Sequence, residues 1–456
     1  MTRPPKPPPR PGRVSLWRYM RLFRQDILSA QPARLYHAWM AEFRTPFFRS
    51  FLCNQPALAD QVLRRRPEDF PKSNRIREGL RPLLGNSVFV TNGEVWKRQR
   101  RIIDPAFEGG RLRDTFAAMR DAGQAAAARL NIKADSQPIE IEEETSHAAA
   151  DVIFRTLFSI GIEDETARAV FAGFRAHQRC QPVLNLGAFV PLPAWLPRFH
   201  SRRTRRTATA IRGLITELVR ARKEEIAAGS APDDLATKIM TTADPETGAR
   251  FEAAEMVDQV AIFFLAGHET SASALAWALY LLALYPDWQE RVAREAQAVH
   301  GARAPEFGDV ARLRVARDVF RETLRLYPPV PMMVREAARA ERFRNRDVPR
   351  GSQIVLSPWH LHRHQRLWER PDDFDPARFA TENGRTCLRE AYIPFSAGAR
   401  VCTGAGFAMI EGPLLLSMLV KDLKFDLDPA RPAMPVAHLT VRGKDGIWLR
   451  VTPRQG

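Results

Sequence analysis

One cysteine, Cys402, lies in a loop that leads directly into an apolar segment with helical periodicity, residues 405–423. The loop reads FSAGARVCTG over residues 395–404. At the mouth of a helix, free N–H groups and the positive end of the helix dipole stabilise a thiolate, the form of cysteine that binds iron. Glycines at 398 and 404 leave room for a flat cofactor beside the backbone. The loop predicts one sulfur presented to a planar ligand; a buried structural cysteine is the simpler alternative.

Two further pairs of residues have helical spacing. Trp96 and Arg100 are four residues apart, so an indole N–H and a guanidinium on one helix face can point at the same anion. Glu322 and Arg325 are three apart and can form an ion pair, which on a surface contributes only about 0.2–0.5 kcal/mol. Taken alone, each pair is more often ordinary surface structure.

Four separated motifs together resemble the cytochrome P450 family. They are WxxxR, AGxET, ExxR and FxxGxRxCxG, which occur in that order at residues 96–100, 266–270, 322–325 and 395–404. The resemblance extends over residues 47–451. It implies a predominantly α-helical α+β fold with small β-sheets, and haem b as cofactor with Cys402 as the axial ligand of the iron. Because a thiolate ligand favours O–O cleavage, it also implies a monooxygenase that inserts one atom of O2 into a lipophilic substrate by hydroxylation or epoxidation.

The same resemblance assigns the residues around the haem. Those expected to contact the cofactor are Trp96, Arg100, Arg335, Arg400, Phe395, Gly404 and Ala266. Glu322 and Arg325 are expected to form a structural ion pair in the core, with Arg378 as its third member in bidentate guanidinium–carboxylate geometry. Arg98 and Arg101 are then left for the surface on which a redox partner docks.

The motif at 266–270 predicts the chemistry on the oxygen-binding side of the haem. Gly267 inside a helix costs about 1 kcal/mol relative to alanine, and the Thr270 hydroxyl can bond back to the carbonyl of Ala266. Together these residues are expected to open the helix locally and make room for O2. Glu269 is expected to relay protons through water to Thr270. His268 is expected to face away from the iron, and no HExxH zinc motif forms because residue 272 is alanine.

Apolar residues from several segments are expected to line the substrate pocket. By the resemblance, this set is Ile262, Phe263, Val330, Met332, Met333, Leu84 and Phe89. Residues 70–90 are predicted to be a long irregular segment that contributes to the lining. Residues 181–200, which are apolar and contain four prolines, are predicted to form a mobile access lid. Packing onto the core is the alternative for both segments.

The scaffold for these sites is predicted to be mainly helical. The long apolar segment at 252–284 predicts a helix buried through the centre of the molecule, and Pro286 is expected to begin the next helix. A further helix at 311–327 is stopped by two prolines, and the tail at 425–450 is predicted to form short strands.

The ends of the chain and one histidine cluster complete the prediction. Residues 1–15 are rich in proline and arginine and are predicted to be disordered, whereas residues 16–456 are predicted to form a single domain. His360, His362 and His364 alternate along the sequence. We expect a structural turn there, and a metal site is the alternative.

The composition favours acidic partners over nucleic acid. The formal net charge of +17 is spread along the whole chain, and no nucleic-acid-binding motif accompanies it. The resemblance implies an acidic ferredoxin or flavodoxin-type electron donor, because the sequence carries no flavin domain after Cys402. No segment offers about 18 uninterrupted apolar residues, and the four cysteines are widely spaced, as in a reducing compartment. We therefore expect a soluble, cytoplasmic monomer without a membrane span.

Two other functions stay open at this point. One is a peroxygenase that uses H2O2, although peroxide already carries the protons that Glu269 and Thr270 are expected to deliver. The other is a non-catalytic haem carrier or sensor, which would not need Thr270 at all.

Overall fold

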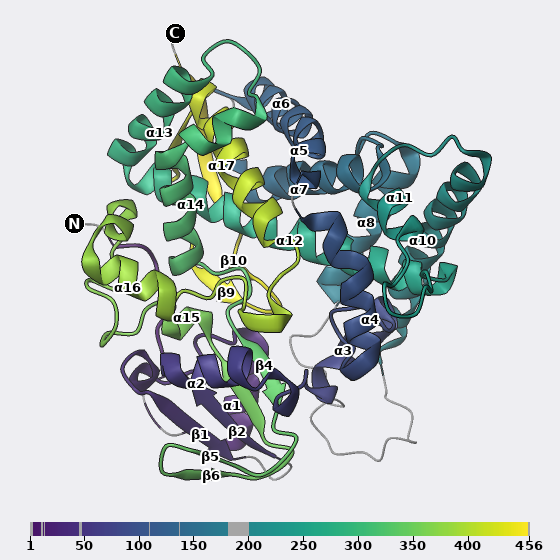
Figure 1. Cartoon of the computed structure of the whole chain (residues 1–456). Helices are drawn as coiled ribbons and strands as arrows, with labels where there is room; N and C mark the ends of the chain where they lie inside the picture. Colours follow the sequence, from purple (N-terminus) through teal and green to yellow (C-terminus); the bar gives the residue numbers. More distant parts are fainter. Residues whose placement is uncertain are drawn as a thin grey trace.

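The computed structural model describes residues 3–10, 12, 14–44, 48–108, 110–135, 137–180 and 200–454. Helices form most of this part of the chain, and small sheets lie beside them in more than one part of the molecule (Figure 1). The arrangement confirms the mainly helical α+β class. The helices are α1 (Leu16–Gln25), α2 (Pro56–Asp60), α3 (Asn74–Leu84), α4 (Gly93–Ile103), α5 (Arg111–Asp114), α6 (Phe116–Lys133), α7 (Ile141–Phe158), α8 (Glu165–Cys180), α10 (Arg202–Ala228), α11 (Leu235–Thr241), α12 (Ala253–Leu284), α13 (Pro286–Val299), α14 (Arg314–Leu326), α15 (Pro358–Leu361), α16 (Glu382–Glu390) and α17 (Ala405–Asp422).

The longest helix, α12, crosses the centre of the helical region (Figure 1). It begins with a capping box, in which the side chains of Glu252 and Glu255 each accept a hydrogen bond from the backbone N–H of the other. Apolar residues cover almost its whole circumference, and α7, α10, α14 and α17 pack against it. Its bounds agree with the predicted 252–284, and Pro286 begins α13 as predicted.

The largest sheet has four strands in the order β1-β2-β7-β4. β2 and β7 run parallel, and the other two pairs are antiparallel. A three-stranded sheet of order β3-β11-β8 and two hairpins, β5–β6 and β9–β10, complete the strands in the described residues. Their bounds are β1 (Met40–Arg44), β2 (Arg49–Cys53), β3 (Ile139–Glu140), β4 (Met333–Glu336), β5 (Glu341–Phe343), β6 (Arg346–Val348), β7 (Gln353–Leu356), β8 (Leu423–Leu427), β9 (Pro435–Ala437), β10 (Val441–Gly443) and β11 (Trp448–Pro453).

The prediction of an irregular segment at 70–90 is wrong for its middle part, which is the helix α3. The side chain of Ser73 caps this helix by accepting from the N–H of Arg75. Leu80, Leu83 and Leu84 lie on its buried face. Pro82 sits in the last turn without ending the helix, so its presence was a poor guide to irregular structure.

The amino-terminal segment also differs from the prediction of disorder. Residues 3–10 lie against the body of the protein, where the carbonyl of Pro5 accepts a hydrogen bond from Tyr327 Oη at 2.8 Å. Lys6 pairs with Asp372 at 2.7 Å and lies over the ring of Tyr36. Composition did not reveal these contacts, because only a backbone carbonyl and one lysine make them. Two of the three contacts join residues more than 300 positions apart in the sequence.

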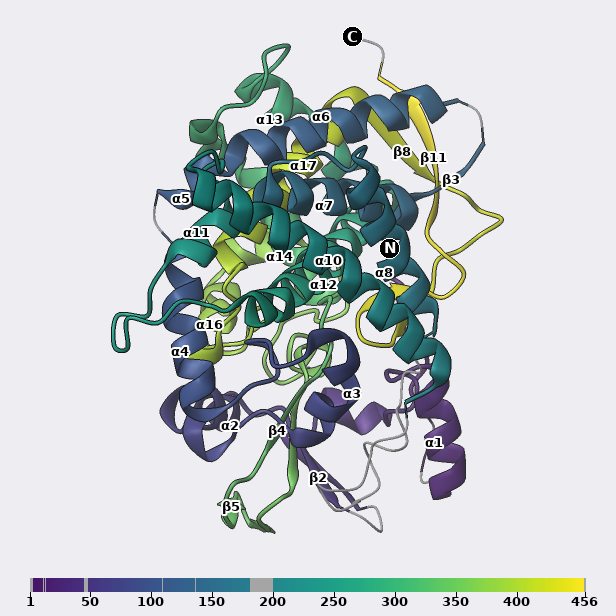
Figure 2. The same ribbon diagram turned by 90° about the vertical axis from the view of Figure 1, so that its right-hand side faces the viewer.

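The predicted lid at 181–200 lies outside the described residues, apart from His200. The helices on either side of it are described: α8 ends at Cys180, and α10 begins at Arg202. Both cover α12 on the side that faces the viewer in Figure 2.

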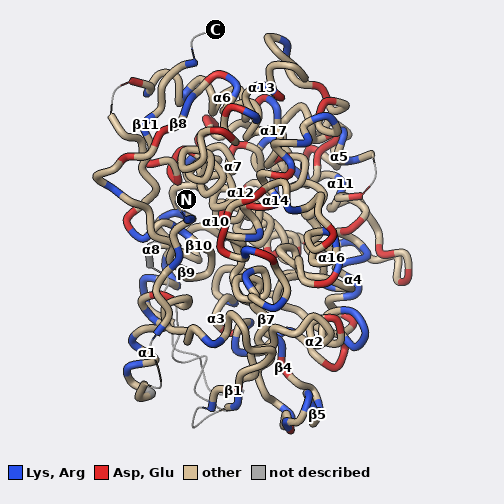
Figure 3. The backbone as a smooth tube through the Cα atoms, turned by 90° about the vertical axis from the view of Figure 1, so that its left-hand side faces the viewer, with Lys and Arg blue, Asp and Glu red and all other residues tan. Residues whose placement is uncertain are grey.

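Basic and acidic residues are interspersed along the backbone throughout the molecule (Figure 3). Two of the basic residues expected to be free for a redox partner are instead paired within the chain. Arg98 binds Glu255 with both terminal nitrogens, at 2.7 and 3.2 Å, and Arg101 binds Asp244 at 2.6 and 3.0 Å. Within the described ranges, no helix combines the length and the apolarity needed to cross a membrane.

Candidate active site

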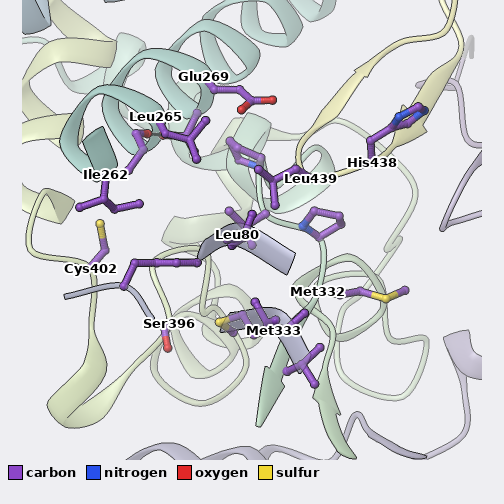
Figure 4. Close-up of a pocket in the computed structure, with 18 of the residues that line it drawn as sticks. Leu80, Ile262, Leu265, Glu269, Met332, Met333, Ser396, Cys402, His438 and Leu439 are labelled. Carbon is purple, nitrogen blue, oxygen red and sulfur yellow. Dashed lines mark hydrogen bonds between the residues drawn. The ribbon is translucent and has the colours of Figure 1, made fainter. Parts of the chain in front are cut away.

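A cavity of about 1170 Å³ lies between α12 and the cysteine loop. Figure 4 shows Ile262, Leu265 and Glu269 entering it from α12, and Cys402 and Ser396 entering from the loop. β4 and the segment before it supply the part of the wall that carries Met332 and Met333. The volume is that of a site for a drug-sized or larger molecule.

The backbone of the cysteine loop is fixed by its own hydrogen bonds and by packing. The N–H of Cys402 donates to the carbonyl of Phe395 at 2.9 Å. Gly398 has φ +68°, and a Cβ there would lie 2.0 Å from the carbonyl oxygen of Leu63. This glycine therefore lets the loop pack on the segment after α2, and the expectation that it makes room for a cofactor is wrong. Gly404 does face the cavity.

Three cations without an acidic partner gather at one end of the cavity: Lys72, Arg335 and Arg400. In the part of the chain that the structure describes, no Asp or Glu pairs with any of them. Burial lowers the pKa of Arg335 to about 10, and burial together with repulsion from Arg335 and Arg100 lowers the pKa of Arg400 to about 10. Burial and the same arginines lower the pKa of Lys72 well below its usual value. This concentration of positive charge predicts an anionic ligand.

Trp96 and Arg100 lie at the same end but differ in what they contact. The ring of Trp96 lies 4.1 Å from the guanidinium carbon of Arg400, so it stacks on that cation. Arg100 pairs with Asp104 at 2.7 Å and donates to the carbonyl of Val401 at 2.8 Å. Arg100 thus already has an acidic partner, whereas Arg335 and Arg400 have none among the residues that the structure describes.

On the opposite side, Ile262, Ala266 and Thr270 of α12 share the face that lines the cavity, as their spacing predicted. The Thr270 hydroxyl donates to the carbonyl of Ala266 at 2.5 Å, which confirms the predicted back-bond. The predicted local opening of the helix is wrong, because α12 is continuous through this turn. Gly267 has another role: a Cβ there would lie 2.3 Å from Ile153, so the glycine lets α12 pack against α7.

Glu269 points away from Thr270. Its Oε1 accepts hydrogen bonds from Thr440 Oγ1 and from Arg442 Nη2, each at 2.7 Å. Figure 4 shows its carboxylate directed toward the segment of His438 and Leu439, not toward Cys402. His268 faces away from the cavity and contacts Ser146 Oγ through Nε2 at 2.6 Å, as expected for a residue that does not bind the iron.

Comparisons with known proteins fit this geometry. The sequence profile of the family described as "Cytochrome P450" matches residues 11–447. The chain belongs to the cytochrome P450 family. A "Cyclooctat-9-en-7-ol 5-monooxygenase" from Streptomyces melanosporofaciens is 32% identical over 419 residues, which are 90% of this chain and 87% of that protein. A "Cytokinin hydroxylase" from Arabidopsis thaliana is 30% identical and covers 83% of this chain and 73% of its own.

A solved structure of a mutant haem domain of cytochrome P450DA has the same fold. It aligns with a TM-score of 0.82 over 99% of this chain and 98% of its own, at 24% identity. The predicted P450 fold is thereby confirmed. Members of the family are monooxygenases that carry haem b with thiolate ligation, so this chain is a haem-thiolate monooxygenase.

The residues of this P450 fit haem b at both faces of the cavity. The unpaired cations Arg335, Arg400 and Lys72 match the two carboxylates of a haem, and Cys402 Sγ opens into the cavity between them and α12. Lys72 was missed by sequence reasoning. It precedes α3 and belongs to no motif, and its β-bridge with Arg335 brings it to the site.

Burial opposes the thiolate form of Cys402. Burial raises the pKa of the Cys402 thiol, and the N–H of Gly404 and the cations Arg100 and Lys72 offset this only in part. The prediction that the helix mouth alone holds a thiolate is therefore corrected. Coordination to a metal ion deprotonates such a thiol directly.

Six of the seven predicted pocket residues line the cavity. Leu84 is the exception, because it is fully buried in the core formed around α12 and α7 and does not reach the cavity. Its neighbour Leu80, one turn earlier on α3, lines the cavity in its place. Those that line it as predicted are Ile262, Phe263, Val330, Met332, Met333 and Phe89.

The predicted ion-pair cluster forms in the core. Arg325 binds both oxygens of Glu322 at 2.7 and 2.8 Å, and Arg378 Nε binds Glu322 Oε1 at 2.9 Å. The remaining guanidinium donors of both arginines reach backbone carbonyls. Every charge is thus satisfied within the cluster, which is 4% exposed or less.

The three alternating histidines have structural partners. His360 Nδ1 bonds with Ser357 Oγ at 2.8 Å, and His362 Nε2 accepts from the N–H of Ile393 at 2.9 Å. His364 stacks on Trp39 with the ring centroids 4.3 Å apart. These contacts agree with the expected structural turn.

Proposed function

We propose that this monooxygenase hydroxylates a bulky, mainly apolar carbocyclic substrate. The observation that carries the proposal is the apolar wall of the cavity near α12 and β4, which is formed by Ile262, Phe263, Met332 and Met333 and lies apart from the cations proposed to hold the haem. Two Streptomyces relatives support it, one named for an oxidation at position 5 of cyclooctat-9-en-7-ol and the other named "Cyclooctatin synthase". Methionine side chains suit a wall that adapts to such a shape.

We propose which residues hold the haem. Cys402 would supply the thiolate that binds the iron, and Arg335, Arg400 and Lys72 would bind the propionates, with Trp96 stacked on Arg400. Phe395, Gly404 and Ala266 line the cavity against its faces. Arg100 supports the loop through Val401 and lines the cavity beside these cations, so it is proposed as a further propionate contact. When bound, the haem supplies the iron centre at which O2 is activated.

Residues of α12 handle protons and position the substrate. The Thr270 hydroxyl holds a proton at the edge of the cavity, and Glu269 supplies protons to it from the solvent side. Ile262 and Phe263 hold the substrate against the reacting centre and keep bulk water away from it. Glu322, Arg325 and Arg378 keep α14 and the segment before the cysteine loop in place.

The electrons are proposed to come from a separate acidic ferredoxin or flavodoxin-type protein. The net charge of +17 supports an acidic partner. Arg98 and Arg101 are taken up by Glu255 and Asp244, so the docking surface is proposed around Val95 and Val401, which are 53% and 37% exposed. A cytoplasmic location and a monomeric state belong to the same proposal.

Product formation under two oxidant regimes tests the function. The holoenzyme is incubated with cyclooctat-9-en-7-ol and related carbocyclic alcohols, either with O2 and a ferredoxin–reductase system or with H2O2 alone. We expect hydroxylated product with O2 and electrons, and Thr270→Ala is expected to divert those electrons to H2O2. Product with H2O2 alone at an equal rate would favour the peroxide-driven reaction, and no product in either regime would contradict the proposed carbocyclic substrate.

A further inference from the structure

The cavity extends past α12 and the cysteine loop to one face of the four-stranded sheet. The pairing of β1 with β2 and of β2 with β7 places Phe43, Leu52 and Val355 on the same face. All three line the cavity, as does Val334 from the same face of β4. On the opposite face, Phe51 is fully buried in a hydrophobic core. The first face is thus the one that a ligand in the cavity can contact.

The helix α1 covers this face of the sheet. The ring of Tyr19 stacks on the ring of Phe43, with the centroids 6.3 Å apart, and lies 5.7 Å from the ring of Phe23. Tyr19, Met20 and Phe23 all line the cavity. We call the space between α1 and this face of the sheet the α1 lobe. Its wall is mainly apolar, which suits a carbocyclic skeleton.

Two polar side chains of the α1 lobe form an incomplete hydrogen-bonding pair. Gln31 Nε2 donates to Tyr19 Oη at 3.5 Å and to the carbonyl of Ile27 at 3.4 Å. Gln31 also lines the cavity and is only 3% exposed, yet its Oε1 has no hydrogen-bond partner among the residues that the structure describes. In the same part of the chain, no group accepts the hydrogen of the Tyr19 hydroxyl. The pair therefore leaves one acceptor and one donor unused.

A hydroxyl group on a ligand can use both of these positions at once. Its oxygen accepts from Tyr19 Oη, and its hydrogen is donated to Gln31 Oε1. A ketone supplies only an acceptor and a hydrocarbon supplies neither, so each leaves a buried polar group without a partner. A carboxylate would bring a charge into an apolar space. Burial also raises the pKa of Tyr19, so its hydroxyl keeps the proton that it donates.

We propose that Tyr19 and Gln31 form a subsite that binds a hydroxyl group already present on the substrate. The inference rests on the proposed function and narrows its substrate class to hydroxylated carbocycles. The hydroxyl is not changed in the reaction. Its two hydrogen bonds fix the skeleton in the α1 lobe and so decide which carbon faces the reacting centre. The substrate must then come from a reaction that installs a hydroxyl, either an oxidation or the capture of water.

Binding of matched ligands to the ferric holoenzyme tests the subsite. The probes are two pairs of a carbocyclic alcohol and its parent hydrocarbon: cyclododecanol with cyclododecane, and androstanol with androstane. Each Kd is read from the change in haem absorbance during titration.

Tyr19→Phe and Gln31→Met each remove one hydrogen bond to the ligand hydroxyl. Each variant is expected to raise the Kd of the alcohol about 2- to 12-fold, the range of a neutral hydrogen bond. The Kd of the parent hydrocarbon is expected to stay at the wild-type value, which also shows that the variant keeps its fold.

Phe23→Leu provides the matched control. It changes the wall of the same lobe without removing a hydrogen bond, so the alcohol and the hydrocarbon are expected to bind more weakly by the same factor. In Tyr19→Phe or Gln31→Met, an equal change for the two members of a pair, or no change for the alcohol, would overturn the subsite. Wild-type holoenzyme that binds neither member of either pair would instead refute the proposed carbocyclic substrate class, and the subsite with it.

Discussion

Two clusters of buried arginines in this P450 differ in whether they include an acidic side chain. Arg325 and Arg378 lie around Glu322, and all the groups in that cluster have partners within the chain. Arg335 is as deeply buried, at 3% exposed, and Arg400 is partly buried, but in the part of the chain that the structure describes neither has an acidic partner. An unpaired buried charge is costly unless something neutralises it. The first cluster therefore serves the fold, and the second is built for an anionic ligand.

The largest effect is expected from removing the carboxylate of Glu322, which Arg325 and Arg378 share. Glu322→Gln leaves two buried guanidinium groups without a counter-charge, which is expected to lower the free energy of unfolding by about 3–5 kcal/mol. Urea denaturation of the holoprotein followed by far-UV circular dichroism measures this. Glu217→Gln, which breaks an exposed pair with Arg220, is the control and is expected to change stability far less. Equal effects of the two variants would contradict a structural role for Glu322.

A different result is expected at the second cluster, in which Arg335 and Arg400 have no acidic partner among the described residues. Arg335→Leu removes an unpaired cation, so the fold is expected to lose little, but the haem loses a charge-assisted hydrogen bond of about 1.5–3 kcal/mol. Transfer of haem from the holoprotein to excess apomyoglobin is then expected to be about 10- to 100-fold faster. Arg339→Leu, at an exposed arginine four residues later, is the control and is expected to leave the rate unchanged. A loss of stability like that of Glu322→Gln, with unchanged haem transfer, would assign Arg335 to the fold.

A smaller, pH-dependent effect is expected at Glu411. Like the unpaired arginines, this buried group has no oppositely charged partner among the described residues. This carboxyl of α17 is 1% exposed, and its partner is Ser271 Oγ at 2.6 Å. Burial raises its pKa from 4.5 to about 7, so the folded state binds a proton that the unfolded state lacks between these values. Its contribution to stability is therefore full below pH 4.5 and is lost as the pH rises to 7.

The comparison of wild type with Glu411→Gln isolates that contribution. The difference in unfolding free energy is expected to shift in favour of the variant by at most about 1.4 kcal/mol per pH unit between pH 4.5 and 7. Denaturation at pH 5.5 and pH 7.5 measures it. A difference that stays constant between the two pH values would show that Glu411 is ionised throughout.

Sequence reasoning predicted the parts of the site that are local in the chain. The cysteine loop, the cavity face of α12 and the Glu322–Arg325 pair each lie within one short motif, whose spacing fixes which side chains share a face. It missed Lys72 and Arg442, because their partners lie more than 170 residues away and no periodicity connects them. The same limit explains Arg98 and Arg101, whose acidic partners could not be inferred from spacing.

Propensity and the resemblance each misled once in the segment at 70–90. Gly79 and Pro82 favour irregular structure by propensity, yet a capped helix with one buried face tolerates both, because packing outweighs propensity. The resemblance predicts Leu84 in the pocket, but helical geometry turns it into the core and turns Leu80 toward the cavity.

The central claim is that Cys402 delivers its sulfur to the haem iron. The most direct test is the absorption spectrum of the reduced holoprotein under carbon monoxide, compared with that of Cys402→Ser. The account predicts the strongly red-shifted Soret band of thiolate-ligated ferrous haem in the wild type and its loss in the variant. A folded, haem-loaded wild type without that band, or a variant that keeps it, would contradict the account.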